Sequence, residues 1–119
     1  MKLIYIITFV LILSCSSKEV KIPKDIIQKD EMIALYIDIH ITDAMVTQKK
    51  IKDVKISNQL KKSYLVSVLK KHNLTMELFE KSNAFYEDNI QLKYDLYNEV
   101  MVKISEKEAL LEELEKEKK

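Results

Sequence analysis

The absence of glycine is the feature that most constrains this chain, because none of its 119 residues is glycine. Glycine-rich loops that bring the backbone close to phosphate groups are excluded, and with them P-loop and dinucleotide-binding sites. The two-residue turns that join β-strands also lose their preferred residue. One cysteine and two histidines exclude a cysteine-built zinc site within one chain. The composition therefore removes several functions, but it does not point to a reaction.

The first 14 residues have the layout of a secretory signal peptide. Lys2 is followed by an apolar run from Leu3 to Leu13, and polar chain begins at Ser14. This run is too short to cross a membrane, because a transmembrane helix needs about 20 apolar residues. We therefore predict that residues 1–14 are a signal peptide.

Cys15, the only cysteine, directly follows that segment. The four residues from Ile12 to Cys15 resemble the bacterial lipobox, in which an aliphatic, a variable and a small residue precede the cysteine. The resemblance implies that the Cys15 thiol receives a diacylglycerol, that cleavage occurs just before it, and that the new amine is acylated, for example with palmitate. A secreted protein with a free thiol and an uncleaved anchor are the alternatives. We expect a lipoprotein of the bacterial cell envelope, at the outer membrane, with its periplasmic or surface face left open.

The rest of the chain divides by composition. We expect residues 15–24 to be the lipidated cysteine and a polar tether, residues 25–104 a helical domain, and residues 105–119 a charged helical extension. The charges nearly balance, with 20 Lys against 19 Asp and Glu, which is not the pattern of a nucleic-acid binder. No cofactor or metal site is expected.

Apolar residues at helical spacing predict an all-α fold, a small bundle of three or four helices. The first helix would run to about Gln48, with Asp25 or Asp30 as its N-cap. Residues 37–42 alternate as a strand would, but we choose helix because the flanks are helical and no partner strand is present. A second helix would run from a cap at Ser57 or Asn58 to about His72.

Two junctions carry recognisable end signals. Asn73 is placed to take the left-handed C-cap conformation in place of glycine, and Thr75 is placed as the next N-cap. Leu74 and Phe79 have the spacing of a hydrophobic staple around that cap. Asp88 and Gln91 have the spacing of a capping box, which predicts the start of a fourth helix.

Several of these segments resemble domain-of-unknown-function family 4296. The first is Pro23-Lys24-Asp25-Ile26-Ile27, followed by Glu31-Met32 and by residues 38–44. The second is the run Tyr64…Val68-Leu69-Lys70-Lys71-His72-Asn73-Leu74-Thr75…Phe79…Ser82…Tyr86. The resemblance covers roughly residues 23–104, and Asn73 stands where the family usually has glycine. It implies a small, mainly helical bacterial lipoprotein and brings no known activity.

Three groups of side chains are candidate sites. His40 and Asp43 lie three residues apart and would share a helix face. They form either a structural polar pair, a partner-recognition element, a proton-transfer pair, or part of a metal site with Asp38 or His72. Tyr64, Tyr86 and Tyr97 either line a groove or belong to the core. The lysines between residues 49 and 62 form a basic patch, which is either a solvated loop or a contact to anionic head groups.

The leading hypothesis is a lipid-anchored, non-catalytic interaction module that binds another envelope protein. A small-ligand or peptide binder that uses a tyrosine-lined groove is the alternative. An enzyme built on His40 and Asp43 is the third hypothesis, and we expect the protein not to be an enzyme.

Overall fold

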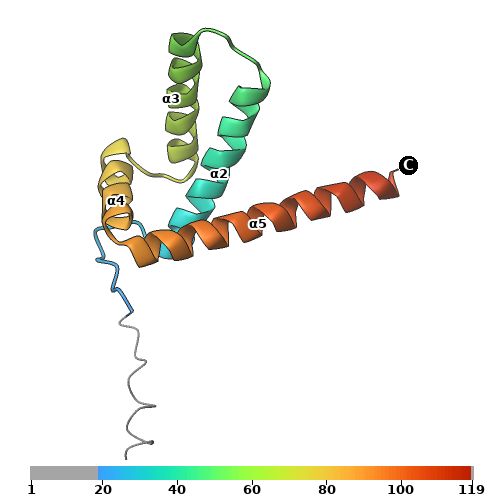
Figure 1. Ribbon diagram of the computed structural model, residues 1–119. Coiled ribbons are helices and arrows are strands. Elements are labelled where there is room, and N and C mark those ends of the chain that lie inside the picture. Colours follow the sequence, from blue (N-terminus) through green and yellow to red (C-terminus); the bar gives the residue numbers. More distant parts are fainter. Residues whose placement is uncertain (1–18, 119) are drawn as a thin grey trace, which may run out of the picture.

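The computed structural model describes residues 19–118, and these residues form four α-helices with no strand among them (Figure 1). The helices are α2 (Lys29–Gln48), α3 (Val54–Lys71), α4 (Met76–Asp88) and α5 (Ile90–Glu117). The predicted all-α bundle is therefore confirmed, and so is the choice of helix for residues 37–42. The predicted signal peptide and Cys15 lie outside the described residues. No helix in the described part of the chain combines the length and apolarity of a membrane span.

Helices α2 and α3 run antiparallel and form an arm that rises from the rest of the molecule (Figure 1). α4 packs against α3 and α5 near the base of the arm. α5 packs against the lower part of α2 and then runs away from the body to the right of the view. The outer end of the arm and the last turns of α5 therefore project in different directions.

The core lies where the first half of α2 meets the other three helices. The buried side chains of α2 point in several directions around its axis because α3 and α5 cover different sides of it. This packing explains why the sequence of α2 lacks a single apolar stripe and alternates in part like that of a β-strand. The core cluster consists of Ile26, Ile27, Met32, Ile33, Leu35, Tyr36, Ile37, Val68, Leu69, Tyr86, Leu92, Leu96 and Val100.

Two side chains of α4 hold the segment that precedes α2. The backbone N–H of Ile27 donates to Ser82 Oγ at 2.9 Å, and the Tyr86 hydroxyl donates to the carbonyl oxygen of Ile27 at 3.0 Å. All three residues are buried. We call this set, Ile27, Ser82 and Tyr86, the N-terminal latch. It fixes the point at which the tether leaves the folded body.

The predicted caps of the first two helices are wrong. α2 begins after Gln28, and neither Asp25 nor Asp30 caps it, because Asp30 already lies in the first turn. α3 is capped by Asp53, whose carboxylate accepts from the N–H groups of Lys55 and Ile56 at 2.9 and 3.2 Å. Asp53 is an equally good cap that comes before Ser57 and Asn58, so the helix starts earlier than predicted.

The junction between α3 and α4 has the predicted geometry. Asn73 has a φ of 57°, and its N–H donates to the carbonyl of Lys70 at 3.1 Å. The N–H of Leu74 donates to the carbonyl of Leu69 at 2.9 Å, which completes a Schellman motif. Thr75 then caps α4 by accepting from the N–H of Leu78 at 3.2 Å. This turn sets the angle between α3 and α4.

The predicted capping box between Asp88 and Gln91 does not form. Asn89 ends α4 and begins α5, and its side chain donates back to the carbonyl of Phe85 at 2.7 Å. The Gln91 side chain instead donates to Asp95 on the next turn of α5. α5 then continues without a break through Ser105 to Glu117, so the charged segment extends a helix of the body.

Candidate functional site

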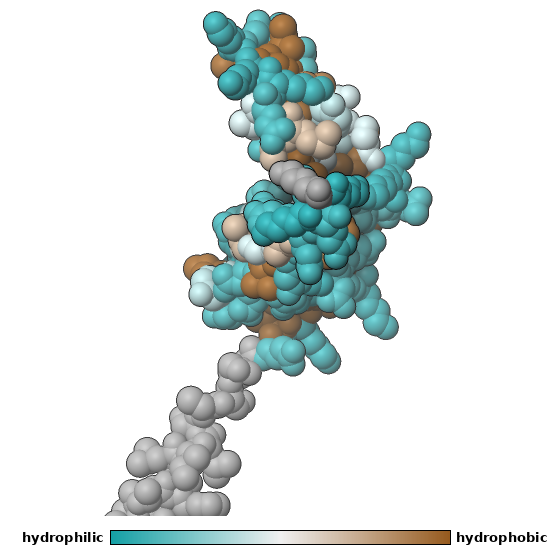
Figure 2. Space-filling view, turned by 90° about the vertical axis from the view of Figure 1, so that its right-hand side faces the viewer, coloured by the Kyte–Doolittle hydropathy of each residue, from teal (hydrophilic) through white to brown (hydrophobic). Residues whose placement is uncertain are grey.

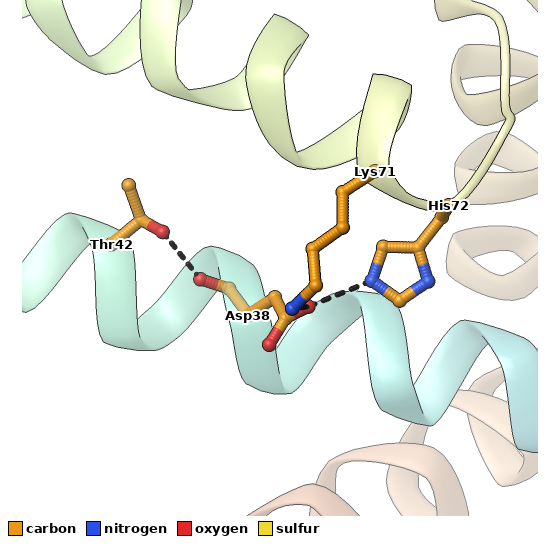
Figure 3. Close-up of polar contacts among 4 residues, drawn as sticks. All are labelled: Asp38, Thr42, Lys71 and His72. Atoms are coloured by element: carbon orange, nitrogen blue, oxygen red, sulfur yellow. Dashed lines mark hydrogen bonds and ion pairs between the residues drawn. The ribbon is translucent and has the colours of Figure 1, made fainter.

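A partly buried polar cluster joins α2 to the C-terminal end of α3, in the part of the arm next to the core (Figure 3). Asp38 Oδ2 lies 2.8 Å from Lys71 Nζ and 2.8 Å from His72 Nε2. The Asp38 side chain is 21% exposed and that of His72 is 17% exposed. Lys71 and His72 stand at the C-terminal end of α3, where positive charge suits the helix dipole. The cluster therefore ties the two helices of the arm together.

Two opposing effects act on the carboxyl group of Asp38. Partial burial raises its pKa, but the hydrogen bonds from Lys71 and His72 together outweigh this and hold the pKa of Asp38 below its ordinary value. A carboxylate that is ionised and bound by two donors is an acceptor rather than a proton source. Across residues 19–118 no third His, Cys, Asp or Glu joins such a group to make a metal site. The arrangement therefore acts as a structural link between two helices.

Substituting Asp38 tests that link. A carboxyl group with a lowered pKa in the folded state stabilises the fold above its unfolded pKa, and the stabilisation is lost as pH falls through the folded pKa. We expect Asp38→Asn to lower the free energy of unfolding by about 1–2 kcal/mol at pH 7. The deficit should shrink below about pH 4, where the wild-type carboxyl also becomes protonated. Urea unfolding at both pH values measures the difference. Asp88→Asn, at an exposed position of α4, is the control. If the stability difference between Asp38→Asn and the wild type were the same at both pH values, the assignment would be contradicted.

The two residues predicted as a polar pair, His40 and Asp43, have different partners. The exposed His40 ring lies among Tyr36 and Tyr97, with ring centroids 6.3 and 6.5 Å away. Asp43 Oδ1 lies 2.8 Å from Lys61 Nζ on α3, and both side chains are well exposed. The pair that does form uses Asp38 and His72, which the sequence suggested only as extra metal ligands. Helical spacing does not predict this pair, because Asp38 and His72 lie on different segments far apart in the sequence.

The three predicted groove tyrosines do not line one groove. Tyr86 is 1% exposed and belongs to the core and the N-terminal latch. Tyr97 is partly buried against Tyr36, with ring centroids 5.5 Å apart. Tyr64 borders a cavity between α2 and α3, and Lys49 Nζ lies 5.6 Å from its ring centroid. Of the two interpretations of these tyrosines, the structure favours the core for Tyr86 and Tyr97, because the segment at Ile27 covers Tyr86 and Tyr36 of α2 covers Tyr97.

A cavity of about 230 Å³ opens between α2 and α3 toward the outer end of the arm. It was not predicted, because it depends on how far the two helices diverge beyond the core. Apolar side chains make up most of its wall, and Asp43, Lys61 and Lys62 stand among them. The lining residues are Ile39, Thr42, Asp43, Val46, Lys61, Lys62, Tyr64, Leu65 and Val68. We call this the arm cavity.

The surface around the arm cavity is basic and partly apolar. Figure 2 shows brown apolar patches among hydrophilic residues at the upper end of the molecule, where the arm ends. Met45, Val54 and Ile56 are 52, 71 and 53% exposed there. The nearby lysines are Lys49, Lys50, Lys52, Lys55, Lys61 and Lys62. This end of the arm lies opposite the point where the described chain begins, at Glu19 (Figure 1).

Residues 23–109 match the family described as "Domain of unknown function (DUF4296)". The match spans most of the chain. The chain belongs to this family. Its matched region includes the N-terminal latch, the Asp38–His72 link and the arm cavity, and it ends within α5. No curated protein and no solved structure matches the chain.

Proposed function

We propose that this family member is a lipid-anchored lipoprotein of the bacterial cell envelope, at the outer membrane, and that it is a non-catalytic module that binds another protein. The lipid on Cys15 would hold it to the membrane through the tether. The outer end of the arm would be its binding surface. The observation that carries the proposal is the arm cavity, an apolar hollow with Lys61, Lys62 and Asp43 in its wall, at the end of the molecule opposite the start of the described chain.

The size of the arm cavity favours a protein partner over a small ligand. Pockets for drug-sized molecules occupy about 300–1,000 Å³ and enclose most of the ligand. A hollow of about 230 Å³ is smaller, and it fits one or two apolar side chains. Helix-in-groove recognition uses such anchors, spaced along one face of an amphipathic helix. The tyrosine-lined ligand groove and the enzyme built on His40 and Asp43 have less support, because those residues are dispersed.

The charges around the arm cavity indicate the chemistry of the partner. Lys55 and Lys62 are exposed, and Lys62 lies in the cavity wall. An acidic partner would be drawn to this end of the arm, which raises the rate of association more than the final affinity. The lysine patch lies at the end of the arm, opposite the start of the described chain, and this position favours contact with a protein over contact with the head groups of the anchoring membrane. We therefore propose an acidic, amphipathic helix as the bound element.

Site-specific photocrosslinking tests the proposal. A benzophenone side chain would replace Tyr64 in the wall of the arm cavity, and the matched control would carry it at Tyr94, which is 63% exposed on α5. We expect irradiated envelopes to yield a discrete protein adduct from position 64 and little from position 94. Lys55→Glu combined with Lys62→Glu should reduce the adduct at least fivefold, while Lys21→Glu with Lys24→Glu, an equal change in charge, should not. Equal labelling from positions 64 and 94 would contradict the proposal.

A further inference from the structure

The last turns of α5 carry an apolar face that is exposed to solvent. Leu110, Leu111 and Leu114 are 57, 60 and 45% exposed. Positions three and four apart lie on the same side of a helix, so these leucines form one face. We call it the leucine face. It lies on a helical segment that extends about 20 Å beyond Ile104, the last α5 residue that packs against the core.

The leucine face is surrounded by negative charge. Six glutamates lie in the same segment of α5, at positions 106, 108, 112, 113, 115 and 117. Four lysines, at 107, 116, 118 and 119, only partly offset them. The end of α5 is thus an acidic amphipathic helix with apolar anchors. This is the chemistry that the basic arm cavity is proposed to bind.

The two complementary surfaces cannot meet within one molecule. α5 leaves the body away from α3, and the arm points in another direction (Figure 1). α5 contacts α2 and α4 but shows no packing against α3 among the described residues. The arm cavity and the leucine face are therefore both accessible to a second molecule.

From this complementarity, and on the basis of the proposed function, we propose that the arm cavity of one copy binds the leucine face of a second copy. Leucines of α5 would enter the cavity between α2 and α3, and the flanking glutamates would face Lys55 and Lys62. A reciprocal exchange between two copies closes the assembly and forms each contact twice. That doubling matters because stable interfaces bury about 1,200–2,000 Å² in total, more than one short helix end supplies.

Disulfide trapping tests the contact directly. Two full-length copies with different affinity tags would be produced together, one with Leu111→Cys on the leucine face and the other with Lys62→Cys at the arm cavity. After mild oxidation of the membranes, we expect a disulfide-linked heterodimer that carries both tags. The matched control pairs Leu111→Cys with Glu80→Cys, at an exposed position of α4. Cys15 is present in both pairings and cannot distinguish them. No heterodimer, or equal amounts from both pairings, would overturn the proposal.

Charge exchange provides a second test that does not depend on new cysteines. Glu112→Lys with Glu113→Lys should reduce dimers of the detergent-purified protein, measured by light scattering, at least tenfold. Adding Lys55→Glu and Lys62→Glu to the same chain should restore them. A monomeric wild-type protein, or charge variants that dimerise as the wild type does, would overturn self-association. A different protein crosslinked from position 64 would then still support the proposed function, whereas equal labelling from positions 64 and 94 would remove it.

Discussion

Replacing Cys15 by alanine is expected to move the protein from the membrane fraction to the soluble fraction almost completely. The sulfur atom of Cys15 would carry the diacylglycerol, and the alanine side chain has no nucleophilic atom that could replace it. Each buried methylene contributes about 0.8 kcal/mol, so two or three acyl chains hold a protein firmly whereas one chain binds only reversibly. Membranes washed with high salt should therefore retain the wild type and lose the Cys15→Ala variant.

The matched control for this experiment is Ser16→Ala, which leaves the thiol in place and should remain in the membrane fraction. Intact mass measurement of the retained protein should give a chain that begins at residue 15 and carries added lipid. A Cys15→Ala variant that stays in salt-washed membranes as the wild type does would contradict lipid anchoring. It would indicate instead that an uncleaved signal segment or the folded body holds the protein there.

The second large effect is expected at Tyr86, the buried member of the N-terminal latch. Tyr86→Ala removes a core ring and the donor to Ile27, and we expect a loss of about 3–5 kcal/mol in the free energy of unfolding. Domains of this size have a total stability of about 5–15 kcal/mol. At about 4–8 °C per kcal/mol, the melting temperature should fall by at least about 12 °C. Thermal unfolding followed by circular dichroism measures the change.

Tyr86→Phe separates the ring from the hydroxyl. It keeps the packing but leaves the carbonyl of Ile27 without its donor, which should cost about 1–2 kcal/mol. Burial also raises the pKa of Tyr86 to about 12. The stability that the neutral Tyr86 hydroxyl contributes is therefore complete below its unfolded pKa near 10, and it is lost as pH rises through about 12. Equal stability of the wild type and both variants would contradict the latch.

Local signals in the sequence were sufficient to predict much of the helical framework. Asn73 and Thr75 act on their own immediate neighbours, so their roles could be inferred from a few residues. The sequence predicts the start of α3 too late because Asp53, an adequate cap, precedes two exposed apolar residues, Val54 and Ile56, that form no helical stripe. Such boundary errors arise where neighbouring residues offer equivalent caps.

The candidate site was less predictable because it depends on contacts between distant segments. Asp38 and His72 are 34 positions apart, and only the packing of α2 on α3 brings them together. The sequence does not distinguish a tyrosine that lines a groove from one in the core. The burial of Tyr86 follows from the segment at Ile27 that lies over α4. The arm cavity has no sequence signature, since it arises from the separation of two helices beyond the core.

Photocrosslinking from position 64 in intact cells tests the central claim, an anchored module that binds protein through its arm, most directly. The account predicts a discrete adduct in the membrane fraction, at least ten times more abundant than that from position 94. Its mass identifies the partner as a second copy or as another envelope protein. No adduct from position 64, or the same diffuse labelling from both positions, would contradict the claim that the end of the arm is a binding surface.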